Sequence, residues 1–167
     1  MKPLVLMLLT AILSLPLHSA DFVPDPFPPA RFTSLYIEKD DKETVITIQL
    51  TGDAVTYTNT VGNKVVENIT VHPAGDDWFN FIQGLNSAKV YKWAPKYDYP
   101  AQGVSWIIDL TMEDRKFTSA GTNDYPKEGA ESDSAADPSG KPSLPFQLFW
   151  QASLALVGKG APPAPAK

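Results

Sequence analysis

The chain has 167 residues, no cysteine and a formal net charge of −5 at pH 7. Without cysteine there can be no disulfide framework and no lipid-modified cysteine. A negatively charged surface repels phosphate backbones, so we expect no nucleic-acid partner.

Residues 1–20 have the pattern of a secretory signal peptide. Met1 and Lys2 form a basic start, the apolar stretch LVLMLLTAILSL follows, and PLHSA supplies a helix breaker and small residues before a cleavage site near Ala20. The apolar stretch is short for a membrane span, and no positive cluster follows it to support the alternative of an uncleaved anchor. We therefore expect a bacterial periplasmic or secreted protein, of charge −6 and with no stable membrane span after cleavage.

The rest of the chain reads as one domain with polar, flexible additions. Residues 21–31 (DFVPDPFPPAR) form a proline-rich linker, and residues 159–167 form a disordered tail. Between them we expect a single domain over residues 32–158, which is long enough for one ordinary core. Residues 127–143 lack large apolar side chains and carry four acids, so they are interpreted as an acidic flexible loop within that domain.

Four β-rich segments open the domain. In TVITIQLT, apolar Ile46, Ile48 and Leu50 alternate with polar residues, which is the period of a strand with one buried face. Short polar turns join this segment to its neighbours, so the pattern predicts an antiparallel meander over residues 32–38, 44–51, 54–60 and 64–71.

A helix is predicted after the meander. Apolar side chains recur there at helical spacing, and Asp76 and Asp77 stand where a cap and first-turn acids belong. The apolar residues are Trp78, Phe79, Phe81, Ile82 and Leu85.

The second half repeats this plan. VSWIIDLTM and KFTSAG read as a hairpin, and SLPFQLFWQASLALVG reads as a helix with Ser143 as cap, Pro145 in the first turn and Gly158 as its end. We therefore predict an α+β fold, an antiparallel sheet of about six strands with two helices packed on one face. The similarity of ITIQLT…WFNFIQGL to WIIDLT…FQLFWQASLAL suggests a possible internal duplication.

Several short motifs of the second half give the chain a resemblance to known proteins. GVSW, with Gly103 three residues before Trp106, is followed by GTNDYP, from Gly121 to Pro126, and by a final Phe- and Leu-containing helix. With the order of the surrounding elements, roughly residues 76–157 resemble a family of exported bacterial proteins without a known activity. Relatives often carry an acid where this chain has Gln102, so no role of that acid transfers. The resemblance implies a shared α+β fold.

Two segments are candidates for ligand contact. VYKWAPKYDYPAQGVSW is rich in aromatic side chains, which can stack on sugars or anchor a protein partner, although they could equally close the end of the core. SAGTNDYP is the second, although turn chemistry alone explains most of its residues. The candidate ligand-binding residues are Tyr91, Trp93, Tyr97, Tyr99, Trp106, Asn123 and Tyr125.

Few residues suit catalysis. His72 is the only histidine after the signal peptide, so a multi-histidine metal site is excluded, and we expect no metal or other cofactor. Helix capping and a hairpin turn explain the acid pairs Asp76-Asp77 and Glu113-Asp114. We therefore predict a non-catalytic binding or interaction module with a protein or glycan partner. The alternative is a small carboxylate-dependent hydrolase acting on envelope or extracellular polymers.

Overall fold

The computed structural model describes residues 28–39, 41–98, 103–113, 115–127 and 141–160. The predicted signal peptide lies outside these residues, as do most of the linker, most of the acidic loop and most of the C-terminal tail. Within the described ranges, no helix has both the length and the apolar character that a membrane crossing requires.

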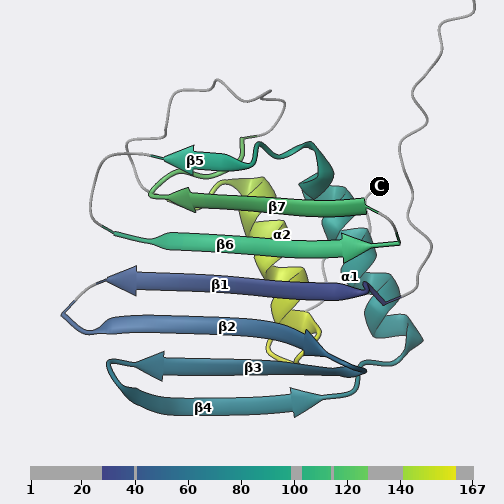
Figure 1. Ribbon diagram of the computed structural model, residues 1–167, viewed down its shortest axis with the longest axis horizontal. Helices are drawn as coiled ribbons and strands as arrows, with labels where there is room; N and C mark the ends of the chain where they lie inside the picture. Colours follow the sequence, from purple (N-terminus) through teal and green to yellow (C-terminus); the bar gives the residue numbers. More distant parts are fainter. Residues whose placement is uncertain (1–27, 40, 99–102, 114, 128–140, 161–167) are drawn as a thin grey trace, which may run out of the picture.

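The chain folds into an α+β structure built on one seven-stranded sheet (Figure 1). Its strand order is β4-β3-β2-β1-β6-β7-β5. Neighbouring strands are antiparallel except β5, which runs parallel to β7. The strands are β1 (Arg31–Lys39), β2 (Glu43–Thr51), β3 (Ala54–Val61), β4 (Lys64–Val71), β5 (Lys96–Asp98), β6 (Ser105–Met112) and β7 (Arg115–Thr122).

Strand β5 is the departure from the predicted sheet, which had about six strands, all antiparallel. It comprises only Lys96–Asp98, too few residues for an alternating pattern to stand out in the sequence. It lies inside the aromatic segment VYKWAPKYDYPAQGVSW. The prediction failed here because pairing with β7, and not local sequence, makes this segment a strand.

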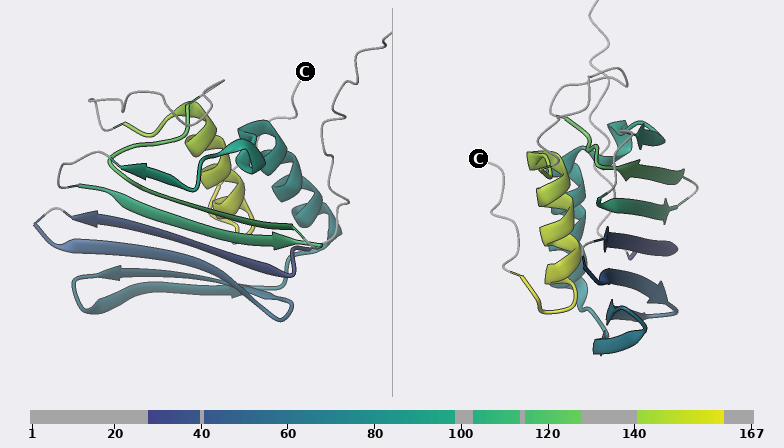
Figure 2. Two further views of the ribbon diagram at one scale, coloured as in Figure 1. Left: turned by 45° about the horizontal axis from the view of Figure 1, so that its top comes forward. Right: turned by 90° about the vertical axis from the view of Figure 1, so that its left-hand side faces the viewer.

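Both long helices cover the same face of the sheet, as Figure 2 shows. They are α1 (Gly75–Ala88) and α2 (Leu144–Ala155), and the short 3₁₀ helix η1 (Val90–Lys92) follows α1. The carboxylate of Asp77 accepts a hydrogen bond from the backbone N–H of Ala74 at 2.8 Å. The hydroxyl of Ser143 accepts one from the N–H of Phe146 at 3.4 Å, so the predicted cap of the last helix is confirmed.

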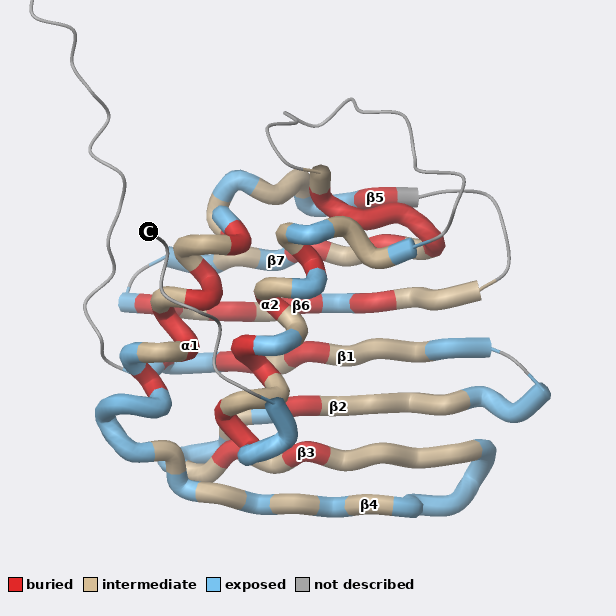
Figure 3. The backbone as a smooth tube through the Cα atoms, turned by 180° about the vertical axis from the view of Figure 1, so that it is seen from behind, coloured by how far each residue is buried: buried red, intermediate tan, exposed pale blue. Residues whose placement is uncertain are grey.

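The hydrophobic core lies between the helices and the central strands (Figure 3). Phe32 of β1 is fully buried, with its ring centroid 4.9 Å from that of Phe81 on α1 and 6.5 Å from that of Phe149 on α2. Trp106, Ile108, Leu110 and Met112 of β6 are buried in alternation with more exposed residues, as the sequence pattern predicts.

No helix in the described part of the chain covers the opposite face of the sheet. Cross-strand pairs such as Thr47 with Thr58 and Thr56 with Thr70 lie on this face, where the two hydroxyls of the second pair are 3.1 Å apart. Ile107 of β6 is among its exposed apolar residues. This open face is rich in threonine, which suits a sheet surface in contact with water.

Candidate functional site

The two most specific motifs of the sequence contact each other. The indole N–H of Trp106 donates a 2.9 Å hydrogen bond to the backbone oxygen of Asp124. The side-chain oxygen of Asn123 accepts one from the backbone N–H of Val104, also at 2.9 Å. The chain from Gly103 to Trp106 and the SAGTNDYP turn therefore form one hydrogen-bonded unit where β6 begins and β7 ends.

The glycines of this unit leave room for close approaches. A Cβ atom on Gly103 would lie 2.2 Å from Oδ1 of Asn123, and one on Gly121 would lie 2.6 Å from the ring of Trp106. Both distances are far below normal van der Waals contact. Packing thus requires glycine at both positions.

Tyr125, one of the candidate residues, is buried in this unit. Its ring stacks near Trp106, with centroids 6.3 Å apart, and lies 4.7 Å from that of Phe146 on α2. Its hydroxyl has no hydrogen-bond partner among the described residues. Burial, followed by the charges of Tyr36 and Glu38, raises the pKa of Tyr125, because the ionised phenolate is poorly solvated there.

Tyr97 and Trp93 are fixed against the same end of the core. The hydroxyl of Tyr97 accepts a 2.8 Å hydrogen bond from the N–H of Ala94, and burial raises the pKa of this buried tyrosine. Trp93 is half-buried, and its indole N–H donates to the oxygen of Ala88 at 2.9 Å. Its ring centroid lies 6.0 Å from that of Trp106. Both residues therefore have a structural role.

The seven candidate residues thus occupy different environments. Tyr97, Trp106, Asn123 and Tyr125 are buried, whereas Tyr91 and Trp93 are half-buried. Tyr99 lies outside the described residues.

Tyr91 and Trp93 meet at an open cavity of about 320 Å³ between the segment after α1 and strand β7. We call this cavity the crossover groove. The sequence alone did not predict that β7 forms one wall of the groove, because the pattern of the KFTSAG segment indicates only a return strand. The groove is lined by Val90, Tyr91, Trp93, Pro95, Ile108, Lys116, Phe117, Thr118 and Ser119.

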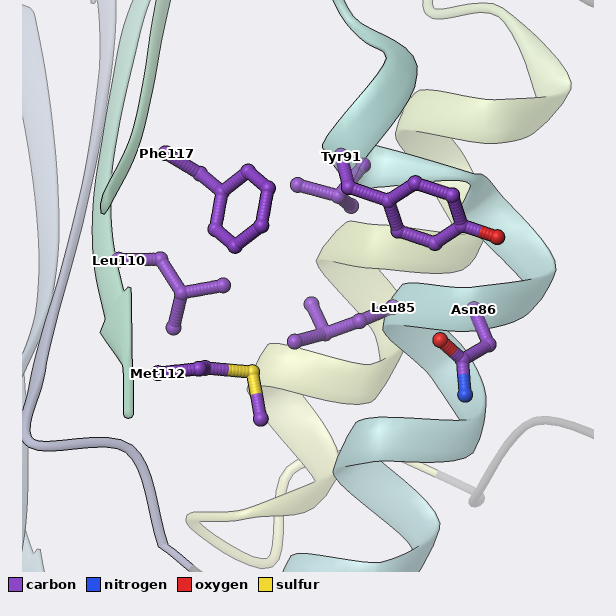
Figure 4. Close-up of a pocket in the computed structure, with 7 residues that line it drawn as sticks. Leu85, Asn86, Tyr91, Leu110, Met112 and Phe117 are labelled. Atoms are coloured by element: carbon purple, nitrogen blue, oxygen red, sulfur yellow. The ribbon is translucent and has the colours of Figure 1, made fainter. Parts of the chain in front are cut away.

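A smaller apolar pocket adjoins the crossover groove (Figure 4) and shares Val90, Tyr91 and Phe117 with it. In Figure 4, Phe117 and Leu110 point from the strands toward Leu85 of α1, and the hydroxyl of Tyr91 points away from the strands. The pocket has a volume of only about 10 Å³, so it accepts no ligand group as it stands. It extends the apolar surface of the groove toward the core.

Hydrogen bonds hold the groove walls in place. The hydroxyl of Ser119 donates to the oxygen of Ala94 at 2.6 Å, and the backbone N–H of Ala120 donates to the oxygen of Pro95 at 3.1 Å. These bonds tie the segment after η1 to β7. The groove is therefore a preformed feature of the fold.

The polar lining of the groove is basic and hydroxylic. Its polar lining residues are Lys116, Thr118 and Ser119, and no carboxylate is among the lining residues. Exposed Lys92 and Lys96 come from η1 and β5 beside it. In a chain with an excess of acids, these lysines give the sheet edge beside the groove a local positive charge.

Residues considered for catalysis lie elsewhere. Asp77 caps α1, and Glu113 has a φ of 52° in the turn between β6 and β7, while Asp114 lies outside the described residues. His72 is exposed after the end of β4, with Nδ1 3.3 Å from Oδ2 of Asp53. The described residues contain no group of three or more His, Cys, Asp or Glu side chains placed to hold a metal ion.

Comparison with known proteins adds no assignment to these observations. Models of known protein families and a set of curated proteins give no match to the sequence. The relationship to an exported bacterial family therefore stays a prediction, and function has to be inferred from the groove.

Proposed function

We propose that the protein is an exported, non-catalytic binding module whose ligand occupies the crossover groove. The observation that carries this proposal is the cavity of about 320 Å³ walled by Tyr91, Trp93 and Phe117. Ligand sites are typically concave, largely apolar and of about 300 Å³ or more. The groove meets these conditions with aromatic walls and a few polar groups at its rim.

The aromatic walls suit binding because they lose little freedom when a ligand arrives. Trp93 is already held by its hydrogen bond to Ala88 and by its ring contacts with Trp106 and Phe149. A side chain ordered before binding does not have to be ordered by the ligand. The half-buried Trp93 thus provides a rigid, partly accessible apolar surface.

The buried candidate residues support the groove from behind. The ring of Trp106 contacts that of Trp93. The hydroxyl of Tyr97 accepts a hydrogen bond from the N–H of Ala94, and the oxygen of Ala94 accepts one from the hydroxyl of Ser119. Binding surfaces depend on such supporting contacts to keep their geometry. We therefore assign the SAGTNDYP unit to positioning and the groove to ligand contact.

Photo-crosslinking tests the proposal whatever the chemical class of the partner. The full chain is expressed in its native cell with p-benzoylphenylalanine replacing Tyr91, and in a matched control with the same residue replacing Phe79, which is exposed on α1. Benzophenone inserts into C–H bonds of proteins and glycans alike.

We expect a discrete adduct from position 91 and none from position 79. Adding Phe117→Ala to the position-91 variant should abolish the adduct, because it removes one wall of the groove. Equal adducts from both positions, or none from position 91 in a folded and exported chain, would overturn the proposal.

A further inference from the structure

The edge of the sheet beside the crossover groove is only partly paired. Strand β5 pairs with Ala120, Gly121 and Thr122 of β7. Among the described residues, no strand pairs with the preceding part of β7 on this side. Part of the β7 edge therefore remains open next to the groove.

The direction of the backbone groups along this edge follows from the register. The N–H of Ala120 points toward β5, since it bonds the oxygen of Pro95. Alternate residues of a strand direct their backbone groups to the same side. Lys116 and Thr118 therefore direct their N–H and C=O groups outward, along the groove.

The opposite edge of the sheet offers a poorer template. Strand β4 has a register shift against β3 between Asn59 and Thr60, which is the mark of a β-bulge. Bulges twist an edge and interrupt the regular spacing that an added strand needs. The pairing of β7 with β6 continues without a shift from Arg115 to Thr122.

The two faces of β7 differ in chemistry. Phe117 is paired with buried Leu110 and faces the helices, on the side where Tyr91 and Trp93 line the groove. Lys116 lies on the opposite face of the sheet. Lys96 of β5 shares this face, because it is paired with Ala120.

We propose that the open edge of β7 binds an extended peptide segment as an added strand, with apolar side chains at alternate positions in the crossover groove and carboxylates at the intervening positions facing Lys116. This proposal rests on the proposed function of the groove and specifies its ligand. Strand addition uses main-chain hydrogen bonds for affinity and side-chain alternation for specificity. The charge of Lys116 and Lys96, in a chain with an excess of acids, favours the acidic partner.

The binding test uses a synthetic peptide of alternating pattern, Glu-Val-Glu-Phe-Glu-Val-amide, labelled with fluorescein at its N-terminus and titrated with the full chain. A peptide of the same composition in two blocks, Glu-Glu-Glu-Val-Phe-Val, is the control for alternation. A version methylated on alternate backbone nitrogens is the control for strand pairing. We expect both controls to bind about tenfold more weakly or worse, because each loses groove contacts or hydrogen bonds.

Variants of the protein also test strand addition. Thr118→Pro removes an outward N–H while leaving the ladder with β6 intact, and it should weaken peptide binding about tenfold. Thr118→Val, which keeps the N–H, should weaken binding much less than Thr118→Pro does. Lys116→Glu should weaken binding of the glutamate peptide and strengthen that of its lysine counterpart.

The outcomes separate this proposal from the proposed function. Equal affinity for the alternating, block and methylated peptides would overturn strand addition. If Phe117→Ala then still weakened binding, the groove would remain a binding site of another kind. No binding of any peptide would also overturn strand addition, while the crosslinking from position 91 would decide independently whether the groove binds a ligand.

Discussion

The indole nitrogen of Trp106 lies 2.9 Å from the backbone oxygen of Asp124, to which it donates a buried hydrogen bond. This contact joins β6 to the turn that follows β7. The turn closes the end of the core under the crossover groove.

The close contact between Gly121 and Trp106 predicts that Gly121→Ala is destabilising. The added Cβ would lie 2.6 Å from the indole ring and from the oxygen of Asp124, so one of them has to move. We expect a loss of about 1–3 kcal/mol in the free energy of unfolding, measured in urea. Gly75→Ala at the start of α1 is the control, because its Cβ would meet nothing within 4 Å. Equal losses for the two variants would contradict the tight packing.

Asn123 is expected to matter for the turn more than for a ligand. Asn123→Ala removes the acceptor for the N–H of Val104 at a residue with a φ of 50°. The lost acceptor and the left-handed backbone together should cost about 2–4 kcal/mol. Asn123→Gly also removes the acceptor, but glycine adopts the left-handed backbone without strain. It should therefore lower the free energy of unfolding less than Asn123→Ala in the same denaturant experiment. An Asn123→Ala chain of unchanged stability that binds no ligand would reassign the residue to the contact surface.

The raised pKa of buried Tyr125 predicts that the folded chain loses stability at alkaline pH. Its pKa is raised in the folded chain, so above the ordinary value of 10 the unfolded chain ionises first and the folded chain loses stability as pH rises. Tyr125→Phe should reduce this loss in thermal melts between pH 8 and pH 11. At pH 7 it should be neutral or stabilising by about 1 kcal/mol, because the hydroxyl has no partner among the described residues. If Tyr125→Phe left the loss of stability with rising pH unchanged, that loss would come from Tyr36 and Tyr97, whose pKa values are also raised.

The last helix is predicted to carry a large share of the stability. Phe149 is fully buried between β1 and Trp93, so Phe149→Ala should cost about 3–5 kcal/mol. Leu144→Ala in the same helix is the matched control, since Leu144 is 57% exposed and should cost less than about 1 kcal/mol. Guanidinium unfolding of both variants measures the difference. A loss below about 1 kcal/mol at Phe149 would place the helix outside the core.

Much of the fold follows from local patterns. The alternation around Ile48 and Trp106 predicts strands with one buried face, and Ser143 predicts the start of the last helix. Strand β5 could not be predicted in this way, because its three residues pair with β7 only once the rest of the sheet is formed.

The candidate site was harder to predict. An aromatic cluster in the sequence does not show which rings are covered, so buried Tyr97 and half-buried Tyr91 look equivalent there. The residues of β7 that line the groove belong to the part of its edge that does not pair with β5. That is a property of the tertiary structure, and Lys116 and Phe117 carry no local signal for it.

The central claim is that the crossover groove is the ligand-contact surface, and NMR tests it most directly. The ¹⁵N-labelled full chain is titrated with the alternating glutamate peptide, and backbone amide and indole N–H shifts are followed. We expect shift changes at Tyr91, at the Trp93 indole and at Lys116 and Thr118. Changes centred on the open sheet face around Thr47, with none at these groove residues, would contradict it.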